Sequence, residues 1–107
     1  MENDKNIVIF ITTGTDGEAR RVAEALLEQR KAACVNVVPT VTSLFWWKDR
    51  IESDQESLLI VKSKASLLDE IVSLVKGVHS YDVPEVIALP IIGGNPDYLN
   101  WISQQTQ

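Results

Sequence analysis

The fold of this chain is decided by a β-hairpin in its middle, with the sequence Leu44-Phe45-Trp46-Trp47-Lys48-Asp49-Arg50-Ile51. The polar segment 48–50 predicts the tip of the hairpin. Successive side chains of a strand point to opposite faces, so Trp46 and Trp47 place one indole on each face. A small domain cannot cover both faces of a long hairpin, and exposed aromatic patches usually mark interaction sites. Phe45, Trp46 and Trp47 are therefore predicted to lie in an interface between subunits. The alternative is that a bulge redirects the strand and folds both indoles into one core.

Hydrophobic periodicity on both sides of the hairpin predicts an alternation of strands and helices. From the N-terminus, the expected elements are a strand at 7–11, a helix ending near 31, a strand at 33–38 with its extension to 47, a strand at 57–62, a helix at 67–77, a strand at 85–92 and a last helix from 95. The order β-α-β-β-α-β plus a C-terminal helix is the ferredoxin-like, split-βαβ motif of the α+β class, with an antiparallel sheet. Residues 1–107 are expected to form a single domain.

Local signals refine this arrangement. Thr15 is expected to cap the first helix, with Glu18 reaching back to it as a capping box. Pro39 cannot donate a ladder hydrogen bond, so it predicts a bulge or a free edge. The charged segment 52–56 can continue the third strand beyond the body of the sheet. Asn95 and Pro96 predict the start of the last helix. The end of the chain, 104–107, is expected to fray.

Composition excludes several classes of protein. The 107 residues carry 15 acidic and 10 basic side chains, a net charge of −5 that repels phosphate backbones and argues against a nucleic-acid partner. No apolar run approaches the roughly 20 residues that span a bilayer, so no membrane association is expected. Cys34 is the only cysteine, which suits a reducing compartment. The N-terminus, Met1-Glu2-Asn3-Asp4-Lys5, lacks the features of a secretory signal. These observations predict a cytoplasmic protein.

Candidate metal ligands gather around His79, the only histidine, in a polar loop that also contains Asp82 and Glu85. A neutral imidazole with nearby carboxylates can bind Cu(II) or another divalent cation, and an oligomer can supply missing ligands. The alternative is a histidine that only forms hydrogen bonds. Cys34, flanked by apolar residues, is read as a small buried hydrophobe or, less favoured, as a soft metal ligand.

Lys62 and Tyr81 are candidate residues of a ligand-binding cleft. Lys62 ends an apolar strand, where it is either a surface charge or a group that binds an anion. The sequence contains no P-loop, no G-x-G-x-x-G after the first strand and no nucleophile elbow. The chain is therefore predicted not to be an enzyme.

Several segments together resemble the CutA divalent-cation-tolerance proteins. The matching features are Ala32-Ala33-Cys34-Val35-Asn36, Pro39, Thr42-Ser43, Trp47, Ile51, Leu58, Lys62, His79-x-Tyr81-x-x-Pro84-Glu85, Leu89-Pro90 and Tyr98-Leu99-x-Trp101. The resemblance runs from about residue 7 to 102. It implies a ferredoxin-like fold, a tight homotrimer whose hairpins join sheets between subunits, and a role in tolerance of divalent metals, chiefly copper, which the protein binds without needing it to fold.

The loop departs from the pattern of that family. The family's His-Pro-Tyr-Glu reads His79-Ser80-Tyr81-Asp82 here, and Asp49 replaces a glycine at the hairpin tip. Of the family's metal ligands only His79 carries over, because Val78 stands in place of a second histidine and the first strand has no cysteine. Three functions therefore stay open: a metal-tolerance trimer, a sensor of small molecules similar to the PII signalling proteins, and a structural or adaptor trimer.

Overall fold

The computed structural model describes residues 4–107, so the N-terminal residues 1–3, part of the stretch analysed for a signal, lie outside the described residues. The elements follow the predicted order. They are β1 (Asn6–Thr13), α1 (Asp16–Glu28), β2 (Cys34–Trp47), β3 (Arg50–Lys64), a 3-10 turn (Ala65–Leu67), α2 (Leu68–Val78), β4 (Val86–Pro90) and α3 (Pro96–Gln105).

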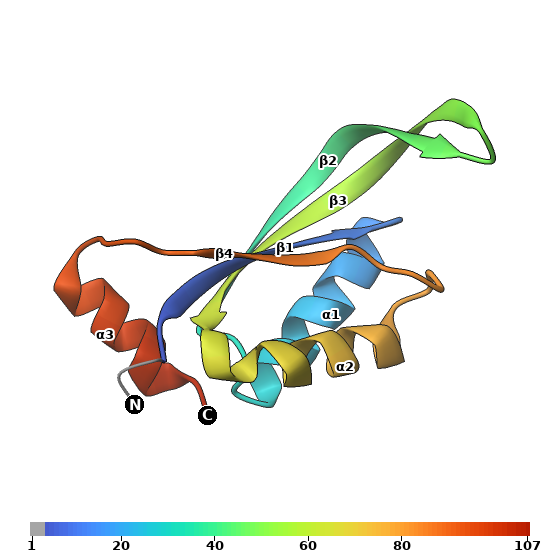
Figure 1. The fold of residues 1–107 in the computed structure, drawn as a ribbon. Helices are drawn as coiled ribbons and strands as arrows, with labels where there is room; N and C mark the ends of the chain where they lie inside the picture. The colour runs from blue at the N-terminus through green and yellow to red at the C-terminus, as the bar shows by residue number, and fades with distance from the viewer. Residues whose placement is uncertain (1–3) are drawn as a thin grey trace.

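One antiparallel sheet carries the fold, with its strands in the order β2-β3-β1-β4. Helices α1 and α2 lie side by side against one face of this sheet, while α3 lies at the end opposite the hairpin tip (Figure 1). None of the described helices is long and apolar enough to span a membrane. The α+β class and the antiparallel sheet are thus as predicted.

The core lies between the sheet and α1 with α2. In β1 and in the inner half of β3, buried and half-buried residues alternate strictly, so every second side chain points towards the helices. The fully buried members of this core are Ile9, Ile11, Ala19, Val22, Leu26, Leu59, Val61, Ile71 and Val75. The apolar side chains at the centre of this side form the core, while the buried polar residues Thr13, Ser57 and Ser63 lie towards its ends.

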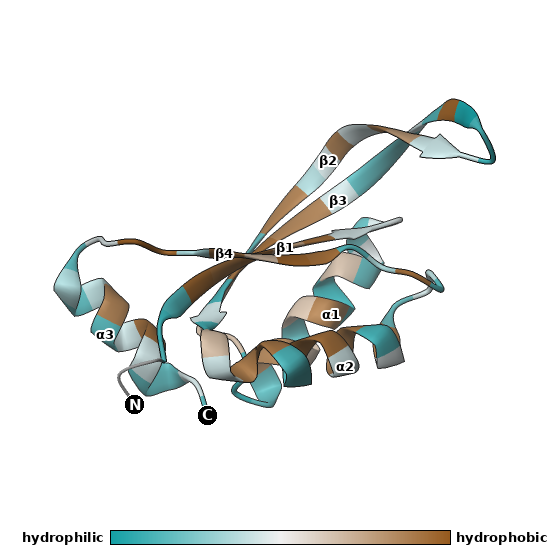
Figure 2. Cartoon of the chain, in the orientation of Figure 1, coloured by the Kyte–Doolittle hydropathy of each residue, from teal (hydrophilic) through white to brown (hydrophobic). Residues whose placement is uncertain are grey.

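The other face of the sheet carries apolar side chains that no helix covers. Val8, Phe10, Leu58 and Ile60 are only half-buried. On β4, Ile87 and Leu89 leave 52% and 47% of their surface exposed. Figure 2 shows the apolar colouring along β1 and β4. A single chain therefore leaves one side of its sheet incompletely covered.

The hairpin formed by β2 and β3 extends far beyond the sheet. The last pair between β1 and β3 is Thr13 with Ser57, and residues 50–56 of β3 pair with β2 alone. The register shifts between Val38 and Val41, which confirms the irregularity predicted at Pro39. A two-residue turn closes the hairpin with positive φ at Lys48 and Asp49, as the twist of a hairpin requires. The predicted tip and the continuation through 52–56 are confirmed.

The first helix ends earlier than predicted. It stops at Glu28 instead of residue 31, because Arg30 adopts a positive φ of 59° and reverses the chain towards β2. The fourth strand is also shorter, Val86–Pro90, since Pro90 is followed by an extended segment outside the sheet. Lys62 does not end its strand, which continues to Lys64.

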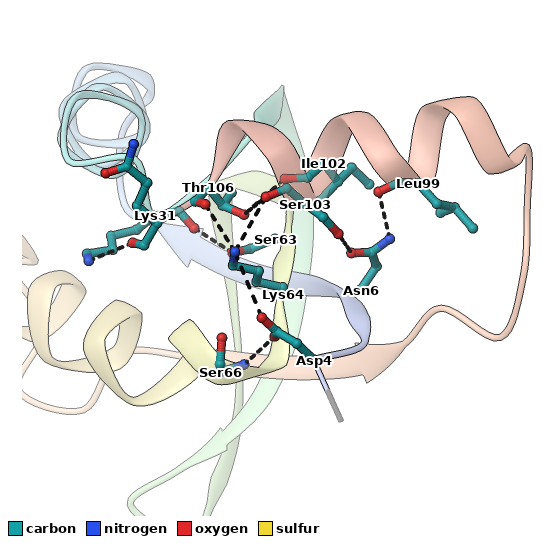
Figure 3. A network of polar contacts seen from close by, with 11 residues as sticks. Asp4, Asn6, Lys31, Ser63, Lys64, Ser66, Leu99, Ile102, Ser103 and Thr106 are labelled. Atoms are coloured by element: carbon teal, nitrogen blue, oxygen red, sulfur yellow. Dashed lines mark hydrogen bonds and ion pairs between the residues drawn. The ribbon is translucent and has the colours of Figure 1, made fainter. Parts of the chain in front are cut away.

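The expectation that the C-terminus frays is wrong. Thr106 is buried, and the amide of Gln107 donates to the Arg30 carbonyl at 2.8 Å. The ammonium of Lys64 donates to the carbonyls of Thr106 at 3.0 Å and Ser103 at 3.4 Å, and lies 3.8 Å from the carboxylate of Asp4 (Figure 3). A cation at the end of a helix satisfies its last carbonyls and opposes its dipole, so Lys64 fixes α3 to the sheet.

The first prediction tests the core. Replacing Ile71 with alanine should lower the free energy of unfolding by about 2–5 kcal/mol, because the change opens a cavity at a fully buried position between α2 and the sheet. Val78→Ala, at an exposed position of the same helix, should change it by less than about 0.5 kcal/mol. Chemical denaturation at one protein concentration measures both. Equal losses in the two variants would contradict the proposed core.

Candidate functional site

The imidazole of His79 is fully enclosed, and both of its ring nitrogens are engaged. Nε2 lies 2.7 Å from the carbonyl oxygen of Thr12 at the end of β1. Nδ1 accepts a hydrogen bond from the backbone N–H of Tyr81 at 3.0 Å. A carbonyl can only accept, so Nε2 carries the proton, and Nδ1 must be unprotonated to accept from the amide. The surroundings therefore hold His79 as the neutral Nε2–H tautomer.

Glu18 is buried beside this ring. The N–H of Glu18 donates to the Thr15 hydroxyl at 3.1 Å, which confirms the predicted helix cap. The other half of the predicted capping box is wrong, because the Glu18 carboxylate turns inward. It accepts from the N–H groups of Gly14 at 3.3 Å and Ser80 at 2.7 Å. Glu18 thus joins the start of α1 to the loop after α2.

The charge state of Glu18 follows from these contacts. Burial alone raises its pKa, but the hydrogen bonds from Ser80 and Gly14 outweigh burial and lower the pKa below its ordinary value of 4.5. The carboxylate lies 3.9 Å from Nδ1 of His79. Glu18 is therefore an ionised side chain held by backbone amides, and it makes no charged pair with the neutral imidazole.

Tyr81 connects the loop to the hairpin. Its hydroxyl donates to the carboxylate of Glu56 at 2.9 Å, and its ring lies 4.7 Å from the ring of His79, centre to centre. Burial, and then the bond to Glu56, raise the pKa of Tyr81 to about 12, so the phenol stays protonated. A Cβ atom on Gly14 would lie 3.3 Å from this hydroxyl, so a glycine leaves the necessary room.

The other predicted site residues lie apart from this network. Asp82 and Glu85 are exposed in the loop before β4. Cys34 is half-buried and pairs in register with Lys62, whose ammonium contacts the side chain of Asn36. Lys62 and Glu56, the partner of Tyr81, are six residues apart on β3, or roughly 20 Å. Lys62 and Tyr81 therefore do not share a cleft within one chain.

A metal ion does not fit the residues around His79 as they are arranged. Neither ring nitrogen is free, and among the described residues no buried side-chain nitrogen or oxygen lacks a hydrogen-bond partner. Over residues 4–107, no three side chains of histidine, cysteine, aspartate or glutamate come together as a possible ligand set. The copper site expected from the sequence is thus not preformed in a single chain.

The aromatic residues of the hairpin are strongly exposed in the single chain. Trp46 is 73% exposed and lies opposite Ile51, which is 63% exposed. Leu44, on the same face, is 70% exposed. The opposite face carries Trp47 at 58% and Phe45 at 39%. The predicted arrangement, with one indole on each face, is confirmed by the register, and the alternative of a common core is wrong.

Comparison with known proteins agrees with this architecture. Residues 7–105 match the family model described as CutA1 divalent ion tolerance protein. The chain belongs to the CutA1 family. The divalent-cation tolerance protein CutA of Thermus thermophilus is 44% identical over 99 residues, which cover 92% of this chain and 96% of that protein. The crystal structure of CutA1 from Oryza sativa has a TM-score of 0.95 and 43% identity, with 100% of this chain and 98% of that chain covered.

Other relatives of the CutA1 family are longer. The rice protein CutA 1, chloroplastic, is 45% identical over 95% of this chain, but the match covers 58% of the rice protein. The mouse protein CutA is also 45% identical, over 92% of this chain, and the match covers 55% of the mouse protein. The chain therefore spans little more than half the length of these two relatives. The family is named for divalent ion tolerance and not for a reaction.

The pH dependence of stability should reveal Glu18. The pKa of Glu18 is lowered in the folded state, so ionised Glu18 stabilises the fold. This stabilisation is complete above the pKa of the unfolded chain, near 4.5, and is lost as the pH falls through the lower pKa of the folded state. The free energy of unfolding of the wild-type protein, minus that of Glu18→Gln, should therefore be constant above about pH 6 and shrink in acid. Denaturation from pH 2 to 8 measures the difference, and a difference independent of pH would contradict this assignment.

Proposed function

We propose that this CutA1-family chain works as a homotrimer in divalent-cation tolerance, binding divalent cations without catalysing a reaction. The observation that carries the proposal is the two-sided apolar hairpin, whose Trp46 and Trp47 are mostly exposed in the single chain. Exposed apolar surface of this extent usually marks an interface. Family membership supports divalent-cation tolerance as the role.

A ring of identical chains suits this surface. In a cyclic assembly each subunit has two neighbours, so one hairpin can present its Trp46 face to one copy and its Trp47 face to the other. The incompletely covered sheet face with Ile87 and Leu89 would be buried at the same time. The outer strands β2 and β4 are sheet edges, and closure against a neighbour protects such edges from uncontrolled pairing.

The cation is proposed to bind donors that are accessible, such as the carboxylates of Asp82 and Glu85, together with groups of a neighbouring copy. Oxygen donors of this kind bind many divalent ions, and Cu(II) adds nitrogen donors where these are free. His79 is not such a donor while Thr12 and Tyr81 hold its ring. The fold does not depend on the ion, because its core is apolar and its buried polar groups are paired within the described residues.

The compartment is part of the proposal. A single cysteine supports a cytoplasmic location, because reducing conditions make disulfides unnecessary. The names of relatives place the rice and Arabidopsis proteins in the chloroplast and the Archaeoglobus fulgidus protein in the periplasm.

Assembly should depend on the indoles. Trp46→Ala and Trp47→Ala should each destabilise the trimer, because truncating a buried aromatic side chain typically costs about 3–5 kcal/mol. Val83→Ala, which changes an apolar residue that is 88% exposed outside the hairpin, is the matched control and should leave the assembly unchanged. Light scattering across a dilution series measures the mass. A wild-type protein that is monomeric at micromolar concentration would exclude the proposed trimer.

Cation binding should depend on the exposed carboxylates. Calorimetric titration with Cu(II) should show weaker binding for the double variant Asp82→Asn, Glu85→Gln, because two charged oxygen ligands are lost. His79→Gln, which preserves a donor and an acceptor, should bind as the wild type does. Loss of binding only in His79→Gln would instead identify the ring as a ligand. Tight binding of a nucleotide or small anion in a parallel panel, with none of Cu(II), would favour the small-molecule sensor.

A further inference from the structure

The stem of the hairpin is the part of β3, residues 50–56, that extends beyond the sheet, and Glu56 lies at its base. Pairing of β3 with β1 begins at Ser57, and the residue before it, Glu56, has β2 as its only strand neighbour. The bulge after Val38 lies at the same level, where the hydroxyl of Ser57 donates to the Pro39 carbonyl at 2.7 Å. At this point the hairpin loses the support of the sheet and its ladder is irregular. Its direction therefore needs a further contact.

We propose that Glu18, His79, Tyr81 and Glu56 form a polar clasp that fixes the hairpin stem to the body of the domain. In this clasp His79 is a positioning residue and not a metal ligand. Each link is an observed contact: Glu18 holds the Ser80 amide, His79 joins the Thr12 carbonyl to the Tyr81 amide, and the Tyr81 hydroxyl reaches Glu56.

The clasp crosses four separate parts of the chain. Its contacts connect the end of β1, the start of α1, the loop after α2 and the first unsupported residue of β3, over sequence separations of 67, 62 and 25 residues. His79 and Glu18 have side chains with 0% and 6% exposure, so their hydrogen bonds are shielded from water. Shielded, fully paired networks are rigid, because breaking one member leaves another buried group unsatisfied.

Steric contacts hold the last link in place. The ring of Tyr81 packs on that of His79, and Gly14 leaves just enough room for the phenol oxygen. Since the phenol stays protonated and donates to a carboxylate, the bond to Glu56 is of the stronger, charge-assisted kind. The clasp acts within one chain. Its importance for assembly rests on the proposed function, since a hairpin held in one direction can meet both neighbours at once.

Hydrogen exchange tests the clasp directly. In Tyr81→Phe, which keeps the ring and removes only the hydroxyl, amides of residues 50–56 should exchange about tenfold faster, as expected for loss of a hydrogen bond to a charged group. Amides of β1 and of β3 residues 57–63 should be unchanged. Asp54→Ala is the matched control and should leave the amides of residues 50–53 and 56 unchanged, because that carboxylate accepts only from the amide of its neighbour Gln55 in the described contacts.

A double-mutant cycle completes the test. Glu56→Ala should accelerate exchange in the stem as Tyr81→Phe does, and the double variant should be no faster than either single variant, because both remove the same bond. Gly14→Ala should act in the same direction by displacing the phenol. Unchanged exchange in Tyr81→Phe, or independent effects of the two substitutions, would overturn the clasp. Light scattering on the same samples tests assembly separately, so a monomeric wild type would exclude the trimer while the exchange data still decide the clasp.

Discussion

The structure depends on one constraint: β2 and β3 are longer than the sheet that supports them. Residues 50–56 of β3 have no partner except β2, so half of the hairpin gains nothing from the packing of α1 and α2. An isolated two-stranded hairpin is marginally stable in water. We therefore expect this hairpin to be stabilised from outside, by contacts at its base and, in the proposed assembly, by surfaces that cover its faces. The exposed indoles at the tip and the hydrogen bonds at the stem both follow from that requirement.

The same reasoning explains the uneven distribution of apolar side chains. A helix layer covers the centre of one face of the sheet, with Ile9 and Val61 fully buried, while the other face retains half-exposed Ile87 and Leu89. Monomeric proteins rarely leave large contiguous apolar surfaces in water. Within the described residues, buried side-chain polar atoms all have hydrogen-bond partners, whereas hydrophobic burial is incomplete. This imbalance is the physical argument for the proposed association with further copies, which would add apolar contacts.

The sequence predicted the features that depend on short-range patterns. The strand β1, the cap at Thr15, the irregularity at Pro39 and the helix start at Asn95 all involve residues within a few positions of one another. The inward turn of the Glu18 carboxylate was not predictable, because its partner Ser80 lies 62 positions away. The fraying expected after residue 104 failed for the same reason, since Lys64 and Arg30 hold the C-terminus from distant elements.

His79 shows how tertiary contacts limit the roles that a lone histidine can take. A polar loop with carboxylates suggests a ligand, but a ligand needs a free nitrogen, and the fold closes both nitrogens with backbone groups. The adjacent Glu18 does not change this, because its charge is already stabilised by amides and does not require a protonated ring. Releasing either nitrogen would leave a buried carbonyl or amide without a partner, at a cost of about 1–3 kcal/mol for each group. For the proposed cation site, donors that water already reaches, such as Asp82 and Glu85, are therefore better candidates than the one imidazole in the chain.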